Sequence, residues 1–134
     1  MRMRWVWAVM LCVVVLAGCS EEEGGAEAES PFLGRAAEIT DLHAAAKWAE
    51  IREDFDDNMR QKLTEQMLAD AWRQLVTQLG PYQSRGEPRV AGVQGGVTAI
   101  DTPMFFEKGE MKSRVSFRRD GKIAGLFILN KHVA

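Results

Sequence analysis

Residues 97–129 read VTAIDTPMFFEKGEMKSRVSFRRDGKIAGLFIL, and their pattern of polar and apolar residues gives the clearest indication of the fold class. Its first part, residues 97–108, alternates in polarity, as a strand with two different faces does. Lys108-Gly109-Glu110 then interrupts the alternation in the way that a hairpin turn does. The residues that follow alternate again, with Met111, Ser113, Val115 and Phe117 on one face and Lys112, Arg114, Ser116 and Arg118 on the other. This pattern predicts an antiparallel hairpin.

Further signals on both sides extend the predicted sheet. Asp120-Gly121 is a strong tight-turn pair. Residues 123–129 are apolar on both faces, which predicts a central or well-covered strand. Upstream, residues 82–90 predict a first strand that a glycine and a proline interrupt, and Gly95-Gly96 predicts a turn. We therefore expect an antiparallel sheet of about four strands.

The first half of the folded region has helical periodicity. Its clearest helix begins after Thr64, whose hydroxyl can cap the first turn, and ends at Gly80-Pro81, because proline cannot continue a helix. Apolar residues recur in it at spacings of three and four, at Leu68, Ala71, Trp72, Leu75, Val76 and Leu79. Residues 31–53 predict one bent helix or two, with Asp41 as a cap of the second, and residues 55–63 predict a short turn or half-helix.

Helices followed by antiparallel hairpins are typical of an α+β domain with helices on one face of a sheet. The largest members of its core are expected to be Trp48, Phe55, Trp72, Phe105, Phe117 and Phe127.

The N-terminus has the pattern of a secretory signal. Arg2 and Arg4 precede an apolar stretch of 14 residues, 5–18. A membrane-spanning helix needs about 20 apolar residues, so the stretch is too short to be one. Leu16-Ala17-Gly18-Cys19 resembles the lipobox of bacterial lipoproteins. That resemblance implies a diacylglyceryl group on the Cys19 thiol and removal of residues 1–18.

The rest of the N-terminal region and the composition narrow the classes of function. Residues 19–30 form a lipidated cysteine and an acidic tether, SEEEGGAEAES after Cys19, which leaves residues 31–134 for one domain. Cys12 falls in the removed peptide, so the mature domain has no free thiol. Loss of Arg2 and Arg4 changes the formal charge from −2 to −4, which argues against a nucleic-acid partner.

Several motifs resemble domain-of-unknown-function family 3887 between about Ala44 and Leu129. They are Phe55-Asp56-Asp57-Asn58-Met59, Leu63, Ala71-Trp72, Gln78-Leu79-Gly80, Phe106-Glu107-Lys108-Gly109 and Asp120-Gly121-Lys122-Ile123-Ala124-Gly125-Leu126-Phe127. The resemblance implies the cone-shaped fold of the nuclear transport factor 2-like, or cystatin-like, superfamily. In that fold, helices pack into the concave face of a curved antiparallel sheet. It implies no established activity and supplies no catalytic residues.

Some members of that superfamily use an aspartate with a tyrosine for acid–base chemistry, and the candidates here are Asp101 and Tyr82. A general base of this kind needs an apolar pocket that raises its pKa. The opposing interpretation is a solvent-exposed aspartate on the sheet. His43 is expected on a helix surface or as a cap and His132 in a terminal tail, so we expect no metal site.

An apolar ligand pocket is the remaining candidate, with Trp72, Met104 and Met111 in its wall, although core packing also explains the methionines. The leading hypothesis is a non-enzymatic lipoprotein without a cofactor, held to membrane lipid by acylated Cys19, that binds a small apolar ligand or a protein. The alternative is a small isomerase- or hydrolase-like enzyme with Asp101 as base, and a homodimer is a further possibility. We expect a periplasm-facing outer-membrane location in a Gram-negative host, or the outer face of the cell membrane in a Gram-positive one.

Overall fold

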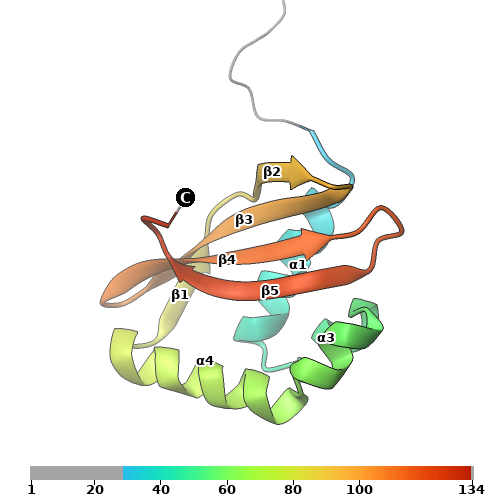
Figure 1. Ribbon diagram of the computed structural model, residues 1–134. Helices are drawn as coiled ribbons and strands as arrows, with labels where there is room; N and C mark the ends of the chain where they lie inside the picture. The colour runs from blue at the N-terminus through green and yellow to red at the C-terminus, as the bar shows by residue number, and fades with distance from the viewer. Residues whose placement is uncertain (1–28, 134) are drawn as a thin grey trace, which may run out of the picture.

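Helices precede strands throughout the part of the chain that the computed structural model describes, residues 29–133 (Figure 1). The helical half contains α1 (Leu33–Ala44), α2 (Trp48–Ile51), the 3-10 helix η1 (Arg52–Asp54), α3 (Asp57–Lys62) and α4 (Glu65–Leu79). The strands are β1 (Tyr82–Arg85), β2 (Arg89–Gln94), β3 (Val97–Phe106), β4 (Gly109–Phe117) and β5 (Ile123–Asn130). The predicted α+β class is confirmed.

The strands form one curved, open antiparallel sheet with β3 and β4 at its centre. β3 is long enough to pair with β2 along its first half and with β1 along its second half. β4 follows β3, and β5 forms the opposite edge (Figure 1). The expected single strand over residues 82–90 is thus two strands, because residues 86–88 lie in neither strand and Pro88 has no N–H to donate to a ladder. The described sheet has five strands.

The inner face of the sheet, which faces α1, carries the core. Strand alternation turns Ile100, Val115 and Phe117 inward, and all three are fully buried. Helical residues that pack against them include Ala36, Ile39, Ile51, Phe55 and Met59. The Phe32 ring stacks on Phe117 with centroids 4.8 Å apart. Among residues 29–133, every buried apolar residue lies between Ala36 and Leu126.

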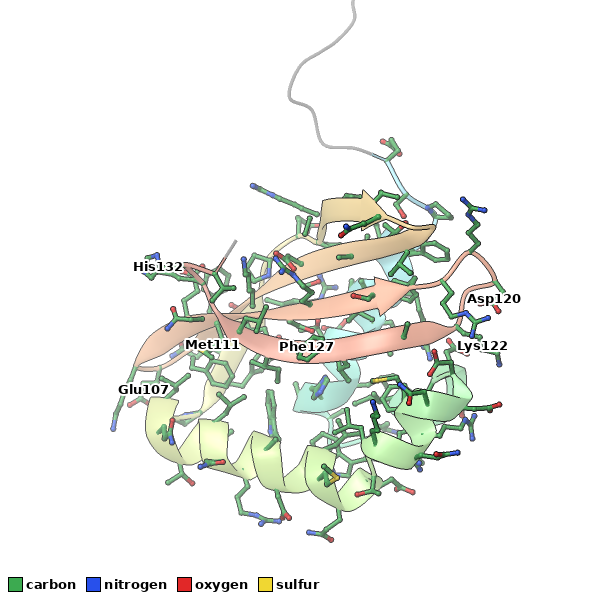
Figure 2. All side chains as sticks on the ribbon, in the orientation of Figure 1. Glu107, Met111, Asp120, Lys122, Phe127 and His132 are labelled. Atoms are coloured by element: carbon green, nitrogen blue, oxygen red, sulfur yellow. The ribbon has the colours of Figure 1, made fainter. Side chains whose placement is uncertain are left out.

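Only part of the predicted core is confirmed. Phe55 and Phe117 are buried, whereas Trp48, Trp72 and Phe105 are half-buried. Phe127 is 56% exposed, on the outer face of β5 (Figure 2). Of the two forms predicted for this strand, central or well covered, the central one is wrong, because β5 pairs only with β4 and lies at the edge of the sheet.

Residues 31–53, which predict one bent helix or two, form separate helices, and the break between them is not at Asp41. α1 continues through Asp41, whose carboxylate lies 2.7 Å from the Arg85 guanidinium on β1, so Asp41 does not cap a second helix. The chain breaks instead after Ala44, where Ala46 has a φ of 58°. The other helix signals are confirmed, since the Thr64 hydroxyl accepts from the Met67 amide at 3.2 Å and Gly80, with φ 80°, ends α4.

Candidate functional site

A groove of about 420 Å³ lies between α4 and the edge strand β5. Figure 1 shows the two elements running side by side. Seven of the lining residues are apolar and come from α4, from the segment before it and from β5: Leu63, Leu68, Ala71, Trp72, Leu75, Leu126 and Ile128. His43, Gln74 and Gln78 add polar groups to the wall.

The groove exists because α4 does not press its apolar face fully onto the sheet. Of that face only Leu68 is buried, while Trp72, Leu75 and Leu79 stay half-buried and Ala71 is exposed. Trp72 holds the helix to the sheet through ring contacts with Tyr82 and Phe106, each with centroids 5.6 Å apart. The groove therefore stays open beside the contact that Trp72 makes with the sheet, and its walls are mainly apolar.

His43 is the buried polar residue of this groove, with an exposed fraction of 2%. Its Nδ1 atom lies 3.0 Å from the Ile39 carbonyl oxygen, and its ring contacts Trp48 and Trp72 at centroid distances of 6.0 and 5.8 Å. Burial lowers the pKa of His43 to about 4, against the smaller raising effect of the Ile39 hydrogen bond. The imidazole is therefore neutral near pH 7.

The position of His43 corrects the expectation of a surface or capping histidine. Helix periodicity contains the missed signal, because Ala36, Ile39, Thr40 and His43 are spaced as one buried face. A helix that starts at Asp41 divides these four residues between two helices, so the prediction does not place them on one face. His132, in contrast, is exposed after β5, as expected (Figure 2).

Asp101 and Tyr82 are on opposite faces of the sheet, so the structure does not bring them together. Tyr82 packs inside against Phe106, at a centroid distance of 5.5 Å. Asp101 points outward opposite Arg114, whose Nε and Nη2 atoms lie 2.7 and 2.8 Å from its two carboxylate oxygens. The Lys112 Nζ atom is 3.2 Å from the same carboxylate.

The electrostatics of Asp101 are also unlike those of a general base. Its partial burial acts to raise the pKa, but hydrogen bonds from Arg114 and Lys112 outweigh this effect and lower the pKa of Asp101. A base for proton abstraction near neutral pH needs the opposite shift. Asp101 is thus the anion of an outer-face ion pair.

Of the three residues expected in a ligand pocket, only Trp72 lines the groove. Met104 is fully buried on β3 and lies opposite the half-buried Met111 on β4, at the inner face of the sheet and outside the groove. Within residues 29–133, no group of three or more His, Cys, Asp or Glu side chains is placed to hold a metal ion. The predicted lipidation site, Cys19, lies outside the described residues.

None of the described helices is long and apolar enough to cross a membrane.

Comparison with known proteins gives a family and a fold. Residues 36–126 match the profile of the family described as "Protein of unknown function (DUF3887)". The chain is also similar to the NMR structure of a protein from Ruminococcus gnavus ATCC 29149, with a TM-score of 0.58 and 12% sequence identity over 75% of this chain and 90% of that one. At this identity the likeness concerns the fold alone. No curated protein matches the sequence significantly.

Proposed function

This chain belongs to the DUF3887 family, and from that premise we propose that it is a lipid-anchored, non-enzymatic binding module that holds a small apolar ligand in the groove between α4 and β5. The observation that carries the proposal is the half-buried apolar face of α4, which lines an apolar groove together with Leu126 and Ile128. Apolar surface left beside a concave site gains free energy when a ligand covers it.

The size and chemistry of the groove support a small molecule. Its volume of about 420 Å³ is within the range of roughly 300–1,000 Å³ that ligand sites have. Its few polar groups, His43, Gln74 and Gln78, are of the kind that orient a ligand in a mainly apolar wall. No arrangement of acid and base among the described residues favours the enzymatic alternative, since Asp101 is engaged by Arg114 on the other face.

The anchoring part of the proposal is supported by the sequence of residues 1–30. The lipobox-like Leu16-Ala17-Gly18-Cys19 and the acidic segment that follows are the arrangement by which a domain is attached to a membrane surface from outside the cytoplasm. Two or more acyl chains on Cys19 would hold the protein stably. The proposed location is the outer membrane facing the periplasm in a Gram-negative host, or the outer face of the cell membrane in a Gram-positive host.

Ligand binding is tested by native mass spectrometry of the protein purified from its own host. We expect an added mass of a small apolar molecule, and a rise in melting temperature when that molecule is returned to stripped protein. The variant Leu75→Glu, which puts a charge into the apolar wall, should lose both effects. Its matched control is Thr77→Glu, an exposed position of α4 outside the groove. An unoccupied wild-type protein whose melting temperature stays constant across lipids and small apolar compounds would refute the proposal.

A further inference from the structure

We propose that His43 selects the ligand of this groove: the occupant is an uncharged apolar molecule with a hydroxyl or N–H group that donates a hydrogen bond to the Nε2 atom of His43. This inference rests on the proposed function, because it specifies the chemistry of the molecule that the groove holds. It also assigns a binding role to a residue whose surroundings are otherwise those of a core side chain.

The tautomer of His43 follows from its one hydrogen bond within residues 29–133. The partner of Nδ1 is the Ile39 carbonyl oxygen, at 3.0 Å, and a carbonyl oxygen only accepts. Nδ1 therefore carries the proton, and in the neutral ring Nε2 carries a lone pair and accepts. Because Nδ1 is turned back to the carbonyl of its own helix, the ring edge that bears Nε2 points away from α1.

The surroundings of that ring edge supply no protein donor. His43 packs against Trp48 and Trp72, and its ring forms part of the groove wall. Among the described residues, Nε2 has no hydrogen-bond partner, and it is not one of the enclosed polar atoms that lack a partner, which are the Thr102 and Ser113 hydroxyls. Since His43 lines the groove, a donor group of a ligand in the groove can supply the hydrogen bond that the protein does not.

The charge of the site decides which ligands fit. Burial keeps His43 neutral near pH 7, so Nε2 presents a lone pair and no proton. A carboxylate offers only acceptor atoms, so it would meet the Nε2 lone pair and would also lose its hydration among the apolar side chains. An alcohol or an amide N–H avoids both penalties. The groove is therefore expected to prefer a fatty or isoprenoid alcohol, or a similar amide, to the acid of the same length.

The test uses three probes with the same chain: 1-decanol, methyl decanoate and decanoate. The protein is the chain from Ser20 to Ala134, which contains all the buried residues of the part that the structure describes. Affinity is measured by isothermal titration calorimetry at pH 7. One neutral hydrogen bond predicts that decanol binds about threefold to tenfold more tightly than methyl decanoate, which has no donor. Decanoate should bind most weakly of the three.

Two variants separate this inference from the proposed function. His43→Phe keeps an aromatic ring and removes the acceptor, so decanol and methyl decanoate should bind with nearly equal affinity. His43→Gln keeps an acceptor oxygen and should retain part of the preference. If decanol has no advantage in the wild type, or keeps it in His43→Phe, the role of His43 is wrong while the groove remains a binding site. If none of the three probes binds, the proposed function fails and this inference fails with it.

A measurement on the wild type covers the case in which a His43 variant does not fold. The ¹⁵N resonance of His43 Nε2 should move in the direction of hydrogen bonding when decanol is added, and should stay in place with methyl decanoate. An unchanged Nε2 resonance in the presence of bound decanol would overturn the inference.

Discussion

The burial of His43 makes the stability of this domain depend on pH in a way that one substitution removes. In the unfolded chain the pKa of a histidine is about 6.5, whereas burial holds the pKa of His43 at about 4 in the folded protein. Between these two values the unfolded state binds a proton that the folded state does not. His43 therefore contributes stability above pH 6.5, and this contribution is lost as the pH falls towards 4.

The size of the effect follows from the two pKa values. At 1.36 kcal/mol for each pKa unit, the interval from 6.5 to about 4 corresponds to about 3 kcal/mol of unfolding free energy. A small domain has only about 5–15 kcal/mol in total, so the loss is large enough to measure. Most of it should occur between pH 6.5 and 4, where the carboxylates of the protein contribute as well.

The variant His43→Phe isolates the histidine from those carboxylates, because it leaves them unchanged. Urea unfolding of wild type and variant, followed by circular dichroism at pH 7, 6, 5 and 4, gives the free energy of unfolding of each. The free energy of unfolding of the wild type, minus that of the variant at the same pH, should fall by about 3 kcal/mol as the pH falls from 7 to 4. Parallel pH profiles would show that His43 is protonated freely in the folded state, and would refute the burial argument.

Three further predictions concern other parts of the molecule. Thr102→Val should leave stability unchanged or raise it by up to about 2 kcal/mol in thermal unfolding, because the buried Thr102 hydroxyl has no partner among the described residues and valine has the same shape; a loss of stability would reveal a partner. Asp101→Asn should cost about 1 kcal/mol of unfolding free energy by weakening the Arg114 pair, and should leave decanol binding unchanged; weaker binding would place Asp101 at the site. Cys19→Ala should leave the circular dichroism spectrum intact and release the protein from membranes in fractionation with a high-salt wash; persistent membrane retention would refute lipid anchoring.

Local sequence signals predict the local structure of this domain well. The alternation over 111–118 identifies both faces of β4, because a strand exposes side chains with a period of two whatever its neighbours are. The Thr64 cap and the end of α4 at Gly80 depend on atoms within the same turn. Each of these features is determined by residues that are its neighbours in the sequence.

Features that depend on distant partners are the ones that sequence reasoning missed. An aspartate at position 41 is a good local cap, but it lies in the last turn of α1 and its partner is Arg85 on β1, 44 residues away. Alternation places Asp101 on one of two faces without saying which is inner, and that choice depends on where α1 packs. An apolar strand is equally consistent with the centre of a sheet and with an edge beside a groove.

That ambiguity of β5 connects the fold to the site. Leu126 and Ile128 point inward from an edge strand. On the side away from β4 they therefore face α4 across the groove, and no further strand covers them. α4 in turn carries an apolar face broader than the part of it that is buried. If folding were the only constraint on this sequence, direct packing of α4 on β5 would make the domain more stable, since buried apolar area contributes roughly 25 cal/mol per Å². The apolar residues of this domain are therefore divided between a core on the α1 side and a groove on the α4 side. The residues of the groove are the part of the sequence that the proposed binding function explains.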